Sequence, residues 1–150
     1  MAIGRLDEDS EGLLLLTTDG MMSEIVRSKK VEKEYYAQVD GIITEEAVEL
    51  LRNGVEIGFN GKKYITKKCK SSILEVIPNL GERGKKIRDE RHGPTSWVSI
   101  TLTEGKFRQV RKMTSAVGFP TLRLVRVRVG NIHLNDLKAG EVLEVGGFDV

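Results

Sequence analysis

Cysteine, histidine and long apolar runs are all scarce in this sequence, and each scarcity excludes a class of protein. Cys69 is the one cysteine, so an internal disulfide is excluded and a reducing compartment is favoured. The longest purely apolar run, Leu13–Leu16, is far too short to span a membrane, and no charged-then-apolar signal segment opens the chain. We therefore expect a cytoplasmic protein without a membrane partner.

Histidine is limited to His92 and His133, which are isolated from each other in the sequence. A protein metal site needs several His, Cys or carboxylate ligands at characteristic spacings. With a single cysteine as well, the sequence predicts no metal site.

Acidic residues are missing from one long stretch, although the totals look balanced. The net charge is only +2, from 24 basic and 22 acidic residues. No acidic residue lies between Glu104 and Asp136, whereas basic residues recur there: Lys106, Arg108, Arg111, Lys112, Arg123, Arg126 and Arg128. Two further basic clusters are Lys62, Lys63, Lys67, Lys68 and Lys70, and Arg83, Lys85, Lys86, Arg88 and Arg91. Grouped positive charge suits a polyanionic partner; the alternative of solvated side chains stays open, most of all for the lysine cluster.

The sequence does have enough apolar material for a single folded unit. Its 150 residues, 39% hydrophobic and 31% charged, fit one domain with a modest core. The sequence shows no internal repeat and no low-complexity segment. One domain over residues 1–150 and a monomeric chain are therefore expected.

Apolar patterning and turn signals predict more strands than helices. The predicted strands are Leu13–Thr18, Tyr35–Val39, Val55–Phe59, Lys63–Thr66, Ile73–Ile77, Val98–Leu102, Thr121–Val129 and Gly140–Val145. Helices are predicted over Met21–Arg27, from an N-cap at Thr44 to Asn53-Gly54, and over Phe107–Val117. Because hairpin signals dominate, we expect a mixed α/β fold of the α+β kind, with a largely antiparallel sheet and flanking helices.

Local patterns sharpen these expectations. Asn60-Gly61 is typical of a tight hairpin turn. Apolar and polar residues alternate over Val98–Leu102, which predicts a strand buried on one face. The apolar parity changes near Leu124-Val125, which predicts a bulge or break there and divides the arginines of that strand between two surfaces. On the helix over Phe107–Val117, Arg111 lies at the border between the apolar and the basic side, where it could reach inward.

Six stretches together carry a family resemblance. They are GRLDEDSEGLLLLTTDG (Gly4–Gly20), KEYYAQV (Lys33–Val39), PTSW (Pro94–Trp97), EGKFRQVRKM (Glu104–Met113), GFPTLRLVRVRVG (Gly118–Gly130) and LKAGE (Leu137–Glu141). In these stretches the sequence resembles a group of ribosomal RNA pseudouridine synthases that comprises types B, E and F for the large ribosomal subunit, together with type A for the small one. The PTSW and RQVRKMT segments are most similar to the E type, which acts on 23S ribosomal RNA.

The resemblance implies roles for particular residues. The aspartate of GRLD is catalytic in that family, which implies Asp7 here. The tyrosine of K-x-Y, here Tyr35, lies against the target base, and the last arginine of RQVR, here Arg111, is the basic partner of the aspartate. The leucine of PTLRL that lines the pocket is Leu122 or Leu124. Further substrate contacts are expected from Arg5, Leu6, Arg108, Lys112, Arg123 and Arg126.

These residue types fit the chemistry that the resemblance implies. Pseudouridine forms when the bond from C1′ to N1 of uracil breaks, the base turns, and C1′ is rejoined to C5. An ionised carboxylate such as that of Asp7 can act as nucleophile or as base, and both roles stay open. An arginine at close range favours the ionised carboxylate, and a tyrosine ring can stack on a base that has left its own stack. No step is redox or consumes phosphate energy, so no cofactor is implied.

The chain also departs from the family pattern. The given sequence begins three residues before GRLD, so we expect a domain that is short of the upstream strand of family members and has no S4-type RNA-binding domain, which many members carry and the E type lacks. We expect a catalytic domain in which a loop presents Asp7 and the leucine strand anchors that loop in the core. The basic loop Pro78–Pro94 is expected to contact RNA.

Two other functions are considered beside an isomerase. The chain could be an RNA-binding module without catalysis, such as a ribosome-assembly factor derived from a synthase; the intact set of Asp7, Tyr35 and Arg111 argues against it. A carboxylate-dependent hydrolase has weak support, because no second acid lies at a telling spacing.

Overall fold

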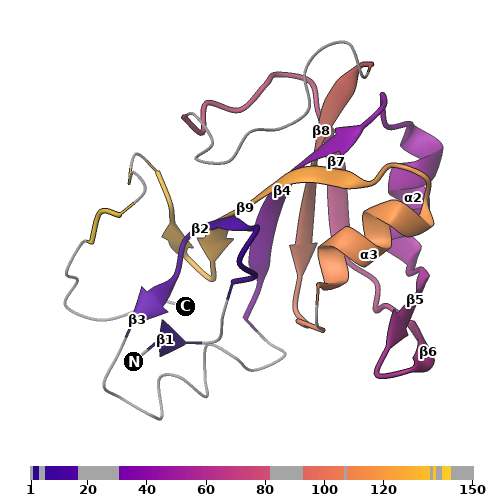
Figure 1. Ribbon diagram of the computed structural model, residues 1–150, viewed down its shortest axis with the longest axis horizontal. Helices are drawn as coiled ribbons and strands as arrows, with labels where there is room; N and C mark the ends of the chain where they lie inside the picture. Colours follow the sequence, from indigo (N-terminus) through magenta and orange to yellow (C-terminus); the bar gives the residue numbers. More distant parts are fainter. Residues whose placement is uncertain are drawn as a thin grey trace.

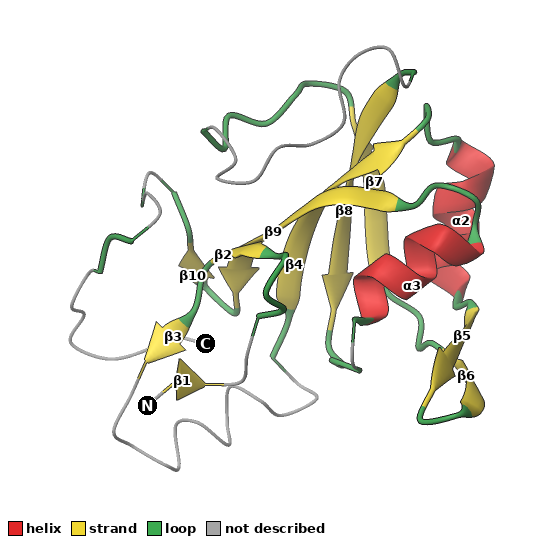
Figure 2. Ribbon diagram, in the orientation of Figure 1, coloured by secondary structure: helices red, strands yellow, loops and turns green. Residues whose placement is uncertain are grey.

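The computed structural model describes residues 2–3, 6–16, 31–81, 93–106, 108–135, 137 and 140–142. Its helices and strands are coloured in Figure 2. The elements are β1 (Ala2–Ile3), β2 (Glu11–Gly12), β3 (Leu15–Leu16), β4 (Lys33–Asp40), α2 (Glu45–Asn53), β5 (Glu56–Phe59), β6 (Lys62–Ile65), β7 (Lys70–Leu74), β8 (Thr95–Leu102), α3 (Gln109–Ala116), β9 (Thr121–Val129) and β10 (Ile132–His133). Among the described residues, no helix has the length and apolar character needed to cross a bilayer.

The described part of the chain is organised around one large sheet. Its strand order is β10-β9-β4-β8-β7, and every pair along this path is antiparallel. The short strand β2 joins the same sheet through a parallel pairing with β9. The small hairpin β5–β6 lies beside α3, away from the N-terminal strands (Figure 1). The prediction of an α+β fold with a largely antiparallel sheet is confirmed.

The main core lies between one face of the sheet and the helices. β4 and β8 contribute Ala37, Val39, Val98 and Ile100, which are all fully buried. These side chains pack with the apolar sides of α2 and α3, which carry Ala47, Val48, Leu51, Val110 and Met113. The apolar side of each amphipathic helix thus makes the contact between that helix and the sheet.

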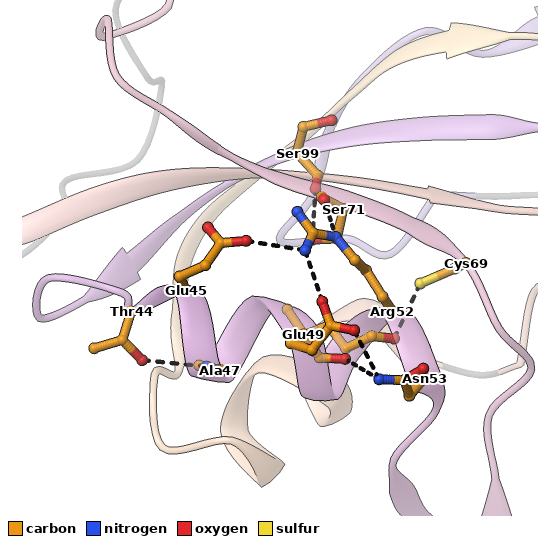
Figure 3. Close-up of polar contacts among 10 residues, drawn as sticks. Thr44, Glu45, Ala47, Glu49, Arg52, Asn53, Cys69, Ser71 and Ser99 are labelled. Carbon is orange, nitrogen blue, oxygen red and sulfur yellow. Dashed lines mark hydrogen bonds and ion pairs between the residues drawn. The ribbon is translucent and has the colours of Figure 1, made fainter.

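Helix α2 has the ends that its sequence predicts. The Thr44 hydroxyl accepts a hydrogen bond from the Ala47 N–H at 3.2 Å, and the Gly54 N–H closes the other end on the Leu50 carbonyl. Arg52 fastens the helix to the sheet edge, because its Nε donates to the Ser71 carbonyl at 2.8 Å (Figure 3). The predicted helix with its N-cap is confirmed.

A buried carboxylate holds the β5–β6 hairpin against the start of α3. Glu104 accepts hydrogen bonds from the Tyr64 hydroxyl, the Lys67 N–H and the Gln109 side-chain amide. Burial opposes ionisation of Glu104, but these donors outweigh it and hold its pKa below the usual value. The predicted Asn60-Gly61 turn is confirmed, since both residues have positive φ and join the two strands of this hairpin.

Two strand predictions need correction. The strand predicted at Ile73–Ile77 is β7, Lys70–Leu74, and Val76 and Ile77 are exposed beyond its end. The first half of β7 is polar and shows no apolar pattern in the sequence. It is a strand because its backbone pairs with β8. The strand predicted over Val98–Leu102 to be buried on one face is buried on both, because Ser99 and Thr101 are as little exposed as 7% and 8%, and the Ser99 hydroxyl donates to Glu34.

The sequence predicts a bulge or a break near Leu124-Val125; the strand does not break there, but it bulges close to this pair. Both residues are buried in an unbroken β9, where they pair with Ala37 and Tyr36 of β4. The register shifts lie on either side of this pair, where β9 has one residue more than β4. Two covered faces, rather than a local kink, therefore account for the change of apolar parity.

The leucine-rich segment is only half buried. Leu13 and Leu15 pack with Val129 in a second apolar cluster, whereas Leu14 is 41% and Leu16 53% exposed. Alternate leucines thus anchor the preceding loop in the core. Of the buried strand predicted over Leu13–Thr18, the described residues form β3, Leu15–Leu16, which is buried on one side only.

The structure confirms the predicted helix over Phe107–Val117 as α3, Gln109–Ala116, and the predicted strand over Tyr35–Val39 as part of β4. Other predictions fall outside the described residues. They are the helix at Met21–Arg27, most of the basic loop at Pro78–Pro94, and the last part of the strand at Gly140–Val145.

The junction of β2 with β9 requires a glycine. Gly12 has φ of +112°, and a Cβ built on it would lie 2.2 Å from the Arg126 carbonyl oxygen. The Leu13 N–H donates to that same carbonyl at 2.9 Å, and the Arg126 Nε donates to the Leu13 carbonyl at 2.8 Å. The N-terminal segment can therefore enter the sheet only with the two backbones in close contact.

We expect Gly12→Ala to destabilise the protein by at least about 3 kcal/mol, because it combines a strained φ with a backbone clash. Gly93→Ala is the matched control: Gly93 has φ of +109°, but a Cβ there meets nothing within 4 Å. The control should cost only the conformational strain, roughly 1–3 kcal/mol. Urea unfolding measures both, and equal losses would contradict the close approach.

The hydrogen bond to ionised Glu104 raises the pKa of Tyr64 from 10.0 to about 12. Because the phenol stays neutral in the folded chain but ionises in the unfolded chain, its stabilising contribution is complete below pH 10 and is lost as the pH rises to about 12. We expect the difference in unfolding free energy between the wild type and Tyr64→Phe to shrink over this interval. A constant difference would contradict the interaction.

Candidate active site

The loop that carries Asp7 is held between β9 and the start of α3. The Ser10 N–H donates to the Asp7 carbonyl at 2.9 Å, which forms a turn over Asp7–Ser10. This turn leads directly into β2 and its parallel pairing with β9. The loop is held on one side by the pairing of β2 with β9 and on the other by Arg111 of α3, which donates to the Asp9 carbonyl.

The Asp7 carboxylate is largely enclosed and lies beside a guanidinium group. Its side chain is 19% exposed, and its Oδ2 lies 3.7 Å from Nη1 of Arg108. The same guanidinium grips Asp9 with two hydrogen bonds of 2.9 Å each. Arg108 thus bridges two carboxylates of one loop, and its planar fork suits that geometry.

Arg108 adopts an unusual backbone conformation. It directly precedes α3 with φ of 52° and ψ of 34°, in the left-handed region that residues with a Cβ rarely occupy. The Gln109 side chain supports the turn, because its Oε1 accepts from the Lys106 N–H at 3.0 Å while its amide donates to Glu104. Such strain at a non-glycine residue persists only where its surroundings fix it, and it occurs often at functional sites.

Arg111 reaches inward from α3, as its border position on the helix predicts. Its side chain is only 12% exposed. Its Nη2 donates to the Asp9 carbonyl at 2.9 Å and to the Ser10 hydroxyl at 3.3 Å, and its Nη1 lies 3.8 Å from Asp9 Oδ2. The structure thus brings Arg111 to the Asp7 loop by way of the residues that follow Asp7. Its role as the partner of the Asp7 carboxylate stays a prediction.

Asp9 is the site residue that the sequence reasoning missed. Its hydrogen bonds with Arg108, together with the nearby charge of Arg111, hold the pKa of the Asp9 carboxyl well below its usual range despite partial burial. The sequence does show a second carboxylate two positions after Asp7, but not which cations it meets. Asp9 binds the Arg108 guanidinium that also lies beside Asp7.

Tyr35 lies one strand away from the loop attachment. It is opposite Arg126 in the pairing of β4 with β9, while Arg126 is opposite Gly12 in the pairing of β2 with β9. Lys33, on the same face of β4, is half-buried, and burial together with the charge of Arg126 lowers its pKa. Arg126 itself is buried and donates to the Leu13 carbonyl.

The two candidate pocket leucines differ in accessibility. Leu124 is 4% exposed and belongs to the main core, whereas Leu122 is half-buried at the register shift of β9. Leu6, directly before Asp7, is also half-buried. Arg5 lies outside the described residues.

The remaining predicted contact residues have partners within the fold. Arg123 is buried and forms a two-pronged ion pair with Glu11, with distances of 2.9 Å. The Lys112 amine donates to the Gly58 carbonyl of the β5–β6 hairpin at 2.9 Å. These contacts give both residues a structural role, whatever they contribute to a substrate.

The chemistry available here is that of one sheltered carboxylate among cations. The neighbouring Arg108 guanidinium, 3.7 Å from Asp7 Oδ2, limits the orientations of the carboxylate oxygens. Such a group can attack a carbon or remove a proton. Cationic side chains and half-buried apolar groups beside it suit a substrate that is anionic but carries a flat, apolar part.

Comparisons with known proteins show which family this chain resembles over most of its length. The family model described as RNA pseudouridylate synthase matches residues 1–116. The chain is 44% identical over 146 residues to a ribosomal large subunit pseudouridine synthase E of Vibrio parahaemolyticus, covering 96% of this chain and 59% of that protein. It is 42% identical to a protein of the same description from Xanthomonas axonopodis, covering 91% of this chain and 70% of the relative.

A solved structure described as a pseudouridylate synthase has the same fold. It superimposes with a TM-score of 0.70 at 30% identity, covering 91% of this chain and 51% of that chain. The present chain therefore spans about three fifths of the length of its Vibrio relatives, 59% and 60%. The family model matches more than half of the chain, and two Xanthomonas relatives with pseudouridine synthase names are matched over at least 70% of their own length. The chain therefore belongs to the RNA pseudouridylate synthase family.

Proposed function

We propose that this chain isomerises a specific uridine of ribosomal RNA to pseudouridine, with Asp7 as the catalytic residue. The observation that carries the proposal is the enclosed Asp7 carboxylate, 19% exposed and 3.7 Å from the Arg108 guanidinium, in the GRLD loop. Relatives named as ribosomal large subunit pseudouridine synthases support RNA of the large ribosomal particle as the substrate. By the resemblance to the E type, that substrate is 23S ribosomal RNA.

The residues divide the work of the reaction. The bond from C1′ to N1 breaks, the uracil turns, a bond from C1′ to C5 forms, the hydrogen of C5 leaves as a proton, and N1 gains a proton. Asp7 acts on the sugar carbon as a nucleophile or on the ring as a base. Arg108 and Arg111 hold its loop, directly and through Asp9. Tyr35 offers an aromatic face to the unstacked base.

Several finer assignments belong to the same proposal. Leu122 is the better candidate for the pocket lining, since it is more accessible than Leu124. The chain works as a monomer in the cytoplasm, and no cofactor takes part. The phosphates around the target uridine lie on the basic residues of α3 and the segments beside it.

We expect Asp7→Asn to abolish tritium release from ribosomal RNA that carries 5-³H-uridine, with a fall of at least about 100-fold. Release reports the reaction specifically, because bonding at C5 expels the hydrogen of that carbon. Glu8→Gln is the matched control, since Glu8 is an exposed carboxylate in the same loop, and it should retain the wild-type rate. RNA binding without release by the wild type would favour a module that binds but does not catalyse.

Arg108→Lys should lower the rate of tritium release about tenfold, a barrier change of about 1.4 kcal/mol. Lysine keeps the charge but cannot grip Asp9 with two bonds while it faces Asp7. Arg52→Lys is the control: Arg52 also bridges two carboxylates, Glu45 and Glu49, and its side chain is 34% exposed against 33% for Arg108. Full activity of Arg108→Lys, or an equal loss in both variants, would contradict the role of Arg108.

A further inference from the structure

Four members of the lysine cluster of the sequence are exposed on one hairpin strand and the segment directly after it. Lys62 and Lys63 are exposed on β6, and Lys67 and Lys68 are exposed directly after it. We call these four side chains the hairpin surface. In the part of the chain that the structure describes, no carboxylate lies within ion-pair distance of their amines.

Few of the described acidic groups compete with this surface. Glu104 lies beneath it but is buried and already accepts three hydrogen bonds. Glu56, opposite Ile65 on the same hairpin, is the exposed carboxylate of β5. The hairpin surface therefore keeps a clear excess of positive charge, which a polyanion could neutralise.

The hairpin surface is also fixed in position. The Tyr64 hydroxyl binds Glu104, the Lys112 amine binds the Gly58 carbonyl, and the Lys106 amine lies 5.2 Å from the centre of the Phe59 ring and 5.1 Å from that of Tyr64. Figure 1 shows the hairpin beside α3. These contacts remove much of the freedom that an exposed hairpin would otherwise have.

The start of α3 connects this surface to the candidate site. Lys106 and Gln109 contact the hairpin and Glu104, whereas Arg108, between them in sequence, holds the Asp7 loop. The start of α3 therefore contacts both the hairpin that carries the lysines and the loop that carries Asp7. This is the arrangement that a phosphate track beside a catalytic site requires, because phosphate contacts fix the register of a nucleic acid.

We propose that the hairpin surface binds the phosphate backbone of the ribosomal RNA that flanks the target uridine. The proposal rests on the proposed function. Compact, exposed ammonium groups suit phosphates, which they bind as point charges. The hairpin surface contributes affinity and register, and the chemical step stays with the Asp7 loop.

The test is the salt dependence of RNA binding by a variant with Lys62, Lys63, Lys67 and Lys68 all changed to Gln. Each lost phosphate contact lowers the slope of log affinity against log salt by about 0.7 to 0.9, so four contacts give a decrease of roughly 3. Single-turnover tritium release at saturating RNA should stay within about twofold of the wild type. A variant with the same four lysines changed to Arg should keep the wild-type slope.

Three results would overturn the proposal. They are an unchanged salt slope in the Gln variant, an equal decrease in the Arg variant, and a large loss of release at saturating RNA with a wild-type melting temperature. The first result would leave the lysines as solvated side chains or as contacts to an acidic protein. Failure of the proposed function would look different, since the wild type itself would then release no tritium while its salt slope could still be measured.

Discussion

The close approach of two backbones at Gly12 and Arg126 is the constraint on which the candidate site depends. A side chain on Gly12 would collide with the Arg126 carbonyl, so the parallel pairing of β2 with β9 requires glycine at this point. The pairing sets where the Asp7 turn begins, five residues earlier in the chain. It also places Arg126 between Gly12 and Tyr35, so the segment that follows the Asp7 loop is joined through β9 to the strand that carries this tyrosine.

The start of α3 is the second support, and it serves both sides of the molecule. Toward the N-terminal loop it offers Arg108 and Arg111, which hold Asp9 and the backbone next to it. Toward the hairpin it offers Gln109, which shares the buried Glu104 with Tyr64. The short turn before α3 therefore contacts both the Asp7 loop and the support of the hairpin surface. Arg108 has a left-handed backbone conformation in this turn.

Much of this could be predicted from the sequence, because local signals and tertiary packing agree over most elements. The capped helix α2, the Asn60-Gly61 hairpin and the inward border position of Arg111 follow from neighbours in sequence. The wrong predictions have a common origin: burial by parts of the chain that are distant in sequence. Ser99 is buried on the face of β8 where its hydroxyl meets Glu34, and Leu124 and Val125 are buried on opposite faces of β9. Asp9 could not be assigned because its role depends on arginines about a hundred residues away, and no local pattern shows which carboxylate those arginines meet.

The central claim is that this chain converts uridine to pseudouridine in ribosomal RNA at the Asp7 loop. The most direct measurement is the nucleoside composition of 23S ribosomal RNA that lacks the modification, before and after incubation with the chain. The account predicts one additional pseudouridine per RNA molecule, an equal loss of uridine, and a single modified position on sequencing. An unchanged composition under conditions in which the RNA is fully bound would contradict it.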